Sequence, residues 1–335
     1  MPVHAVGMLL MWRQIAVVLI IIGVSMACCF CSPGRAFAED VSDLDCNGHF
    51  NPFMPTLVLK YEVAYRLFWL DLMHLADAFV YATDGEWFNE ATGEWRRAYL
   101  LVFHLDTLEE SSEIGTGHYS IHNRLATILL KPTLEPLIFV KRDYMHVDTF
   151  HSKIDIHNAE YFSVEAGKND YIKKDYACNA TSTNMPYFAK LVDQRKEVFR
   201  FMKTVAAIYA GKTNDFSATN NFTVSIFTDN AYVPFTVDIY RKFKLLDMLN
   251  NDYKTIYFTA EPARGYHGKG RNLSAWIAPF NYMAEMAGDE QLISMAGQTF
   301  EMGMIPLMAD FGLKLGTVRC SLVRMSLESV FDSND

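Results

Sequence analysis

The sequence lacks the usual signatures of catalytic and cofactor-binding loops. It has no G-x-S-x-G nucleophile elbow, no G-x-x-x-x-G-K-S/T loop, and no G-x-G-x-x-G after a strand-like segment. The glycine-rich stretch 264–272 has neither the length nor the Ser or Thr of a phosphate loop, so we interpret it as a turn. These absences predict no cofactor and favour a protein that is not an enzyme.

Positive charge is also scarce. The chain of 335 residues carries 30 Lys and Arg against 39 Asp and Glu, a formal net charge of −9. Residues 1–38 contain two of the basic residues and none of the acidic ones, so the remainder has a net charge of −11. Nucleic-acid binding depends on clustered Lys and Arg. The charge balance therefore argues against nucleic acid as a partner.

Cysteine is sparse after residue 38, where only Cys46, Cys178 and Cys320 occur. No two of them have the close spacing of a metal-binding C-x-x-C motif. In an oxidising compartment Cys178 and Cys320 could form a disulfide. Spacing alone leaves the alternative, unpaired buried cysteines, equally open.

One long apolar run lies near the amino terminus. Arg13 precedes the apolar residues 15–30, and an Ala-Phe-Ala segment ends at Ala38 before Glu39. A basic residue, an apolar stretch and a small-x-small site are the parts of a signal peptide, so we expect cleavage between Ala38 and Glu39. An uncleaved signal anchor and a lipoprotein, lipidated at Cys28, are alternatives. Each predicts an exported protein of the periplasm or cell envelope.

The remaining sequence is rich in strand-like patterns. Half of all residues are hydrophobic and 14% are aromatic, enough for a sizeable core. We expect a loop at 39–56, a single β domain at 57–328 and a disordered tail at 329–335. Strand-like segments lie at 57–66, 75–80, 97–108, 125–130, 137–142, 144–150, 161–165, 222–227, 233–240, 253–259 and 273–278. Close succession of strands predicts a mainly antiparallel sheet.

A few segments depart from this pattern. Apolar residues recur with helical spacing at Val198, Met202, Val205 and Tyr209, which predicts a long helix over 191–210. We interpret 168–185 as a loop, 83–85 as a turn, and 281–300 as a small insertion with a short helix at 288–300. Residues 313–322 alternate with a phase shift at 316–317, as in one strand with a bulge.

Several short motifs resemble a family of uncharacterised exported bacterial proteins. They are Leu59-Lys60-Tyr61-Glu62-Val63, Leu75-Ala76-Asp77-Ala78, the helical segment 199–209, Leu273-Ser274-Ala275-Trp276-Ile277, Ile305-Pro306-Leu307, and Leu313 through Gly316 to Leu322. The family usually has acidic residues after the Trp strand, where this chain has Ala278-Pro279-Phe280. The resemblance implies a strongly curved antiparallel sheet, a half-barrel or open barrel, with one long helix packed across it. That shape is similar to periplasmic lipid carriers of the LolA type. The resemblance transfers no catalytic residues.

Two groups of ionisable residues invite a chemical interpretation. His118, His122, His146, His151 and His157 lie among Asp143, Asp148 and Asp155, and His and Asp are Zn²⁺ ligands. Their spacing matches no metal motif, so we favour solvent-facing strand residues and predict no metal. Asp106 with Glu109, Glu110 and Glu113 could supply paired carboxylates for glycoside chemistry. A solvated acidic turn is again the favoured interpretation.

Aromatic residues on strand segments are the more suggestive feature. In a filled core they would only pack, but in a sheet too curved to fill itself they would line an apolar cavity for an acyl chain. The candidate ligand-binding residues are Trp69, Phe103, Phe139, Tyr257 and Trp276. The leading hypothesis is a non-enzymatic envelope protein that binds a lipid-like ligand or another envelope component. The alternatives are a scaffolding partner protein with a filled core and an envelope hydrolase or metal-binding protein.

Overall fold

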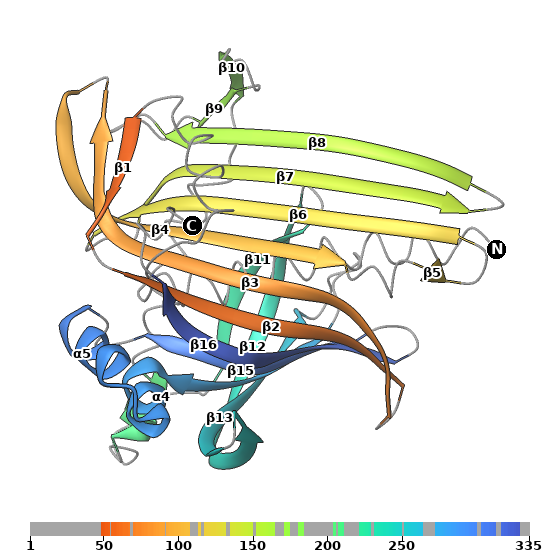
Figure 1. Ribbon diagram of the computed structural model, residues 1–335, viewed down its shortest axis with the longest axis vertical. Helices are drawn as coiled ribbons and strands as arrows, with labels where there is room; N and C mark the ends of the chain where they lie inside the picture. Colours follow the sequence, from red (N-terminus) through yellow and green to blue (C-terminus); the bar gives the residue numbers. More distant parts are fainter. Residues whose placement is uncertain are drawn as a thin grey trace, which may run out of the picture. The chain divides into compact units, whose positions relative to one another are not determined.

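The computed structural model describes residues 48–53, 55–67, 70–90, 92–107, 113–114, 117–131, 135–149, 152–164, 171–174, 180–183, 204–205, 207–210, 221–228, 231–249, 251–263, 272–299, 303–312 and 316–328. The predicted signal peptide, its cleavage site at Ala38 and Glu39, and the tail at 329–335 lie outside these residues. Within them the chain is mainly β, and its strands form a large antiparallel sheet, as predicted (Figure 1).

The chain divides into two compact units. Among the described residues, unit 1 contains those of Tyr61–Leu75 and 204–323, and unit 2 contains those of 48–60, 76–183 and 324–328. Strands β2 (Thr56–Leu67) and β3 (Leu70–Asn89) each contain residues of both units. The single β domain that we expect for 57–328, and its half-barrel or open-barrel shape, stay predictions.

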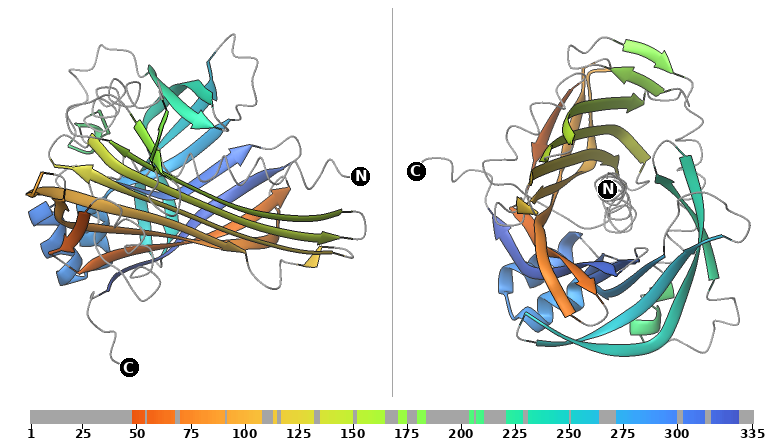
Figure 2. Two further views of the ribbon diagram at one scale, coloured as in Figure 1. Left: turned by 90° about the horizontal axis from the view of Figure 1, so that it is seen from above. Right: turned by 90° about the vertical axis from the view of Figure 1, so that its right-hand side faces the viewer.

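Unit 2 contains strands in the order β10-β9-β8-β7-β6-β4-β3-β2, with β1 paired to β3 and β5 paired to β6. Its long strands β6, β7 and β8 run alongside each other in Figure 1 and in the left view of Figure 2. The strands not yet delimited are β1 (Gly48–Pro52), β4 (Glu94–Thr107), β5 (Glu113–Ile114), β6 (Gly117–Leu130), β7 (Glu135–Thr149), β8 (Ser152–Val164), β9 (Tyr171–Lys174) and β10 (Ala180–Thr183).

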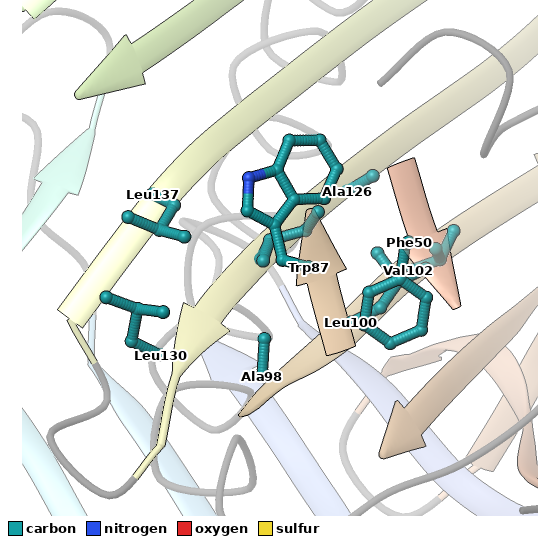
Figure 3. Close-up of a cluster of buried hydrophobic side chains, with 9 residues drawn as sticks. Phe50, Trp87, Ala98, Leu100, Val102, Ala126, Leu130 and Leu137 are labelled. Atoms are coloured by element: carbon teal, nitrogen blue, oxygen red, sulfur yellow. The ribbon is translucent and has the colours of Figure 1, made fainter. Parts of the chain in front are cut away.

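Strand β4 is buried on both faces along its middle. All residues from Ala98 to Leu105 are buried, which matches the long apolar run in the sequence. Alternate residues of a strand point to opposite faces. One face of β4 therefore joins the hydrophobic cluster that Figure 3 shows. Within this cluster Leu100 pairs with Ile128 of β6. The same cluster contains Phe50 and Trp87, which pair across β1 and β3.

Gly85 permits β1 to lie close to β3. A Cβ atom at this position would meet the Asn51 carbonyl oxygen and would lie 2.7 Å from Cζ of Phe50. The sequence predicts a turn at residues 83–85, but they lie inside β3, so that prediction is wrong. A glycine within a strand can mark the close approach of another backbone, and it does so here.

A buried carboxylate also belongs to unit 2. The Asp84 side chain is 4% exposed, and its Oδ2 pairs with Lys131 Nζ and lies 3.6 Å from a guanidinium nitrogen of Arg97. Lys131 Nζ also lies 3.9 Å from the centre of the Tyr99 ring. An ionised carboxylate out of contact with water is stable only when it is paired, so these cations make the burial of Asp84 possible.

We expect Lys131→Met to lower the free energy of unfolding by about 3 kcal/mol or more, because it removes the cation closest to the buried Asp84 charge. Arg96→Met is the matched control, since the Arg96–Glu94 pair is 3.0 Å long but its side chains are 42% and 59% exposed. Such an exposed pair contributes about 1 kcal/mol or less. Urea unfolding followed by circular dichroism measures both, and equal losses would contradict the assignment.

Unit 1 contains strands in the order β2-β16-β15-β14-β13-β12-β11. Those after β2 are β11 (Asn221–Thr228), β12 (Ala231–Met248), β13 (Asn251–Pro262), β14 (Leu273–Pro279), β15 (Met304–Gly312) and β16 (Thr317–Glu328), which belongs to this unit as far as Val323. One face of the sheet is packed with apolar side chains, among them Phe258, Ala275 and Val318, each at most 6% exposed. The buried Tyr61 of β2 donates its hydroxyl to the carbonyl oxygen of Pro306 on β15, at 3.0 Å.

The chain reverses between β15 and β16. The alternation in the sequence predicts a single bulged strand over 313–322, but Gly312 pairs with Thr317 across β15 and β16, so Gly316 lies in the connection of a hairpin. Gly316 has a φ of 82°, a region that residues with a side chain adopt only with strain. A Cβ atom there would also meet the Arg66 carbonyl oxygen. The phase shift in the sequence is therefore a turn and not a bulge.

We expect Gly316→Ala to destabilise the protein more than Gly93→Ala. Gly93 has a similar φ of 69°, but a Cβ atom added there would have no atom within 4 Å, so its substitution carries only the backbone cost of roughly 1–2 kcal/mol. Gly316→Ala adds a clash with the Arg66 backbone, about 1–3 kcal/mol more. Thermal unfolding of the two variants measures the difference. Equal losses of stability would contradict the prediction, because they would show that the backbone of β2 at Arg66 moves aside without cost.

Two helices connect β14 to β15. Helix α4 (Phe280–Ala287) ends at Gly288, which has a φ of 68° and donates its N–H to the Ala284 and Glu285 carbonyls. Helix α5 (Glu290–Thr299) begins immediately after Asp289, whose Oδ1 accepts N–H groups of the helix's first turn. Figure 1 shows the two helices side by side. The predicted short helix at 288–300 corresponds to α5, and α4 was not predicted.

The long helix predicted over 191–210 lies mostly outside the described residues. Thr204, Val205 and Ala207–Tyr209 are helical, but the complete helices of the described part have only 8 and 10 residues. No long helix packed across the sheet is among them, and none of them is long and apolar enough to span a membrane.

Segments interpreted as loops contain short strands instead. Strand β1 lies within 39–56, and β9 and β10 lie within 168–185. The two strand-like segments at 137–150 form one strand, β7. Strand β1 pairs with β3, whose paired residues are more than 30 positions away in the sequence. Strands β9 and β10 pair with neighbours, but their own residues lack clear alternation. The local sequence pattern alone therefore does not reveal these strands.

Strand β13 pairs with β14 only from Ile256 onward. Before that point, tyrosine side chains make hydrogen bonds to the backbone of β13. The Lys254 N–H donates to the Tyr282 hydroxyl oxygen at 3.0 Å, and the Tyr209 hydroxyl donates to the Lys254 carbonyl oxygen. Burial raises the pKa of the Tyr209 hydroxyl, and nearby Tyr282 raises it further, so Tyr209 stays a donor. Both backbone groups of Lys254 are thus hydrogen-bonded by side chains.

Candidate functional site

Two of the five predicted ligand-binding residues lie next to each other in unit 1. Tyr257 on β13 and Trp276 on β14 are a register pair, and their ring centres are 4.7 Å apart with the planes tilted by 45°. Both side chains are half-buried. Aromatic pairs at this separation attract each other beyond the effect of their buried area. The antiparallel pairing of β13 with β14 thus creates a continuous aromatic platform.

A third ring and two cations extend this platform. Tyr240 on β12 lies 5.1 Å from Tyr257 between ring centres and is 50% exposed. Lys244 Nζ lies 3.8 Å from the centre of the Tyr257 ring and 5.8 Å from that of Trp276. The Arg319 guanidinium lies 5.8 Å from the centre of the Trp276 ring. We call Tyr240, Tyr257, Trp276, Lys244 and Arg319 the aromatic–cation surface.

The two cations of this surface differ in what they can bind. Arg319 is held by Asp310 through two hydrogen bonds of 2.6 and 2.5 Å, the bidentate geometry that guanidinium and carboxylate prefer. Lys244 is exposed, and among the described residues no carboxylate lies within ion-pair distance of its Nζ. The charge available to an added anion is therefore that of Lys244, while Arg319 is largely neutralised.

The sequence reasoning missed Tyr240 as a site residue, and Lys244 and Arg319 altogether. The predicted strand ends at 240, whereas β12 continues to Met248 with a register shift between Ile239 and Phe243. That irregularity shifts the register by two residues, which leaves Lys244 on the face of Tyr240 and Tyr257 but places it opposite Thr255 instead of Tyr253, and so nearer to Tyr257. Arg319 was accessible to sequence reasoning, because it alternates with the buried Val318 and Cys320 on β16.

The other predicted ligand-binding residues lie elsewhere. Phe103 is on β4 of unit 2 and is 7% exposed. Phe139 is on β7, where it pairs with Thr127 and Phe162. Trp69 lies outside the described residues. The structure thus brings together Tyr257 and Trp276 but places Phe103 and Phe139 in the other unit.

Cys320 is buried, with 1% of its surface exposed, and its thiol is free, while Cys178 lies outside the described residues. Burial raises the pKa of the Cys320 thiol, and the nearby Asp310 carboxylate raises it further. Thiolate, not thiol, is the reactive form of cysteine. Low reactivity in the folded protein follows from both effects.

We expect iodoacetamide at pH 8 to leave Cys320 unmodified in the folded protein and to alkylate it after unfolding in guanidinium. Peptide mapping by mass spectrometry resolves this cysteine from the others. The thiol stays protonated at this pH and is shielded from the reagent. Alkylation of Cys320 at the same rate in both states would contradict the burial.

The register of unit 2 pairs several members of the histidine group that the sequence analysis singles out. Cross-strand pairs join His118 to Asp148, Ser120 to His146, and His146 to Asp155. Asp143 pairs with Asn123 and Asn158, and His157 pairs with Tyr144. His151 lies outside the described residues. In the described part of the chain, no three His, Cys, Asp or Glu residues are arranged to hold a metal ion.

Comparison with known proteins identifies no family. No family model and no curated protein matches the sequence. Among solved structures, the chain is similar to a β-barrel-like protein of the domain of unknown function DUF1849 from Brucella abortus, with 11% sequence identity and a TM-score of 0.39. The match covers 83% of this chain and 99% of that one. A likeness at this level carries no functional argument.

Proposed function

We propose that this chain is an exported envelope protein that binds an amphipathic, anionic ligand at the aromatic–cation surface. The observation that carries the proposal is the position of Lys244, whose exposed ammonium lies 3.8 Å from the centre of the Tyr257 ring, which in turn pairs with Trp276. Half-buried rings offer apolar area to a hydrocarbon chain. The ammonium beside them attracts a carboxylate or phosphate.

The charge pattern favours an anionic over a neutral ligand. Arg319 and Asp310 compensate each other, so the surface retains the positive charge of Lys244 in a chain whose net charge is −9. An ammonium above aromatic faces is partly desolvated, which strengthens its attraction to an added anion compared with a fully hydrated one. A fatty-acid-like molecule meets both requirements, with its chain on the rings and its head at Lys244.

We expect oleate to bind the protein, purified from a bacterial periplasm after expression of the full chain, more tightly than methyl oleate. Lys244→Ala should weaken oleate binding about threefold, the effect of one partly exposed ion pair, and leave methyl oleate unchanged. Lys254→Ala is the matched control, because Lys254 is also exposed and pairs with Leu245, the residue after Lys244. Calorimetry below the micelle concentration measures each dissociation constant.

Two results would count against the proposal. One is equal affinity for oleate and its methyl ester, since it would remove the role of the ammonium. The other is an equal loss in Lys244→Ala and Lys254→Ala, which would indicate only a general charge effect. Native mass spectrometry with organic extraction of the same preparation identifies any lipid that purifies with the chain.

A second candidate is a partner-binding role, the other half of the leading sequence hypothesis. Phe243 and Leu245 on β12 are 42% and 68% exposed, an apolar pair on one strand that faces solvent. Tyr209 packs edge-on against Phe243 at 4.9 Å between ring centres and fixes that ring. If this face serves a partner, replacement of both residues by Ser should abolish capture of an envelope protein while oleate binding remains. Undiminished capture by the double variant would exclude the face.

A further inference from the structure

A hydrogen-bonded chain of three side chains crosses β4 and β6 in unit 2. Ser120 Oγ lies 2.7 Å from His122 Nε2, and His122 Nδ1 lies 2.6 Å from Asp106 Oδ1. The backbone explains the arrangement, because Asp106 and His122 are a register pair and Ser120 is two residues from His122 on the same face of β6. The strand register thus places the hydroxyl, the imidazole and the carboxylate next to one another on one face of the sheet.

A second histidine completes the bonding of the carboxylate. His104 Nε2 lies 2.9 Å from Asp106 Oδ2, and the His104 side chain is 8% exposed. Arg124 Nε also lies 3.2 Å from His104 Nε2. A ring nitrogen either donates or accepts a hydrogen bond. We assign His104 Nε2 as the donor to Asp106, because its distance to Asp106 Oδ2 is shorter than its distance to Arg124 Nε. Asp106 is therefore held by a histidine on each oxygen.

The proton positions follow from the state of Asp106. Burial by itself would raise the pKa of this carboxyl, but hydrogen bonds from His104 and His122, and the charge of these rings, hold the pKa well below its usual range. An ionised carboxylate only accepts, so His122 Nδ1 carries the hydrogen. In the neutral ring Nε2 then has a lone pair, and the Ser120 hydroxyl donates to it. This is the tautomer in which imidazole acts as a base toward serine.

We propose that Ser120, His122 and Asp106 form a nucleophilic site that hydrolyses small carboxylic esters. Ser120 Oγ bonds to the acyl carbon while His122 Nε2 takes its proton, and the alkoxide leaves with that proton as an alcohol. Water then attacks the acyl-serine and gives a proton to His122, and the acid departs as Ser120 Oγ takes the proton back. Ester and water are consumed, and one acid and one alcohol are formed.

The surroundings suit a small ester in solution. The side chains of His122 and Asp106 are 44% and 35% exposed, so the face is open to solvent. His146 on β7 is the register partner of Ser120 and is half-buried. Cross-strand Cβ atoms lie about 4.5–5.5 Å apart, so a ring N–H of His146 can reach the oxygen of a carbonyl that Ser120 attacks. Asp106 acts through His122 as a positioning residue, and His104 acts through Asp106.

The test is active-site labelling of the purified full chain with a fluorophosphonate probe, read out by peptide mass spectrometry. We expect an adduct on Ser120 and hydrolysis of p-nitrophenyl acetate that Ser120→Ala abolishes. His122→Gln should slow labelling about 100-fold, the usual effect of removing a positioned base. His49→Gln is the matched control, since His49 Nε2 lies 3.2 Å from Glu90 in the same unit but away from Ser120, and labelling should stay within about twofold.

Asp106→Asn separates a positioning role from a structural one. Loss of the correct tautomer should lower kcat for the acetate ester about 100-fold and leave KM unchanged, with an unaltered circular dichroism melt. The proposal is overturned by a folded parent protein that gains no adduct on Ser120, or by labelling that His122→Gln does not slow. Failure of this test has no bearing on oleate binding at the aromatic–cation surface, which belongs to unit 1.

Discussion

The pairing of β4 with β6 positions both the hydrophobic cluster of unit 2 and the hydrogen-bonded chain of Ser120, His122 and Asp106. Leu100 lies opposite Ile128 in the hydrophobic cluster, and six residues further along β4, Asp106 lies opposite His122. Strand β4 is apolar on both faces from Ala98 to Phe103, so hydrophobic burial alone would tolerate a shift of one residue. The polar pair would not, because a shift moves His122 to the other face from Asp106. The hydrogen bond between Asp106 and His122 at the end of β4 thus fixes the register of the apolar middle of this strand against β6.

In unit 1 the position of Lys244 depends on a break in regular pairing. Register shifts occur between Ile239 and Phe243 on β12 and between Trp276 and Ile277 on β14. The first brings Lys244 over the Tyr257 ring, and the second lies directly after Trp276. A bulge bends its strand and redirects the side chains beside it. The position of Lys244 on the aromatic–cation surface therefore depends on an irregularity, whereas the Tyr257–Trp276 pair and the polar chain of unit 2 depend on regular pairing.

Much of the fold and part of the site were predictable because alternation reports burial directly. The strands at 57–66, 97–108, 222–227, 253–259 and 273–278 were recovered for this reason. Gly85 and Gly316 were misread, because whether a glycine serves a turn or the approach of another strand depends on distant residues. Tyr257 and Trp276 were selected as aromatic strand residues, but their contact depends on a register that no local pattern specifies. Asp106 and His122 are 16 positions apart in the sequence, and only the return of β6 onto β4 makes them neighbours.

The tyrosines around Lys254 have a consequence for association between molecules. A strand edge with free N–H and C=O groups can template pairing with a second chain and so seed aggregation. On β13, Tyr282 accepts the Lys254 N–H and Tyr209 donates to the Lys254 carbonyl oxygen, so two phenols take the place of a neighbouring strand. They satisfy the backbone without offering an edge of their own. The hydroxyls of Tyr209 and Tyr282 thus prevent another strand from pairing with β13 at Lys254.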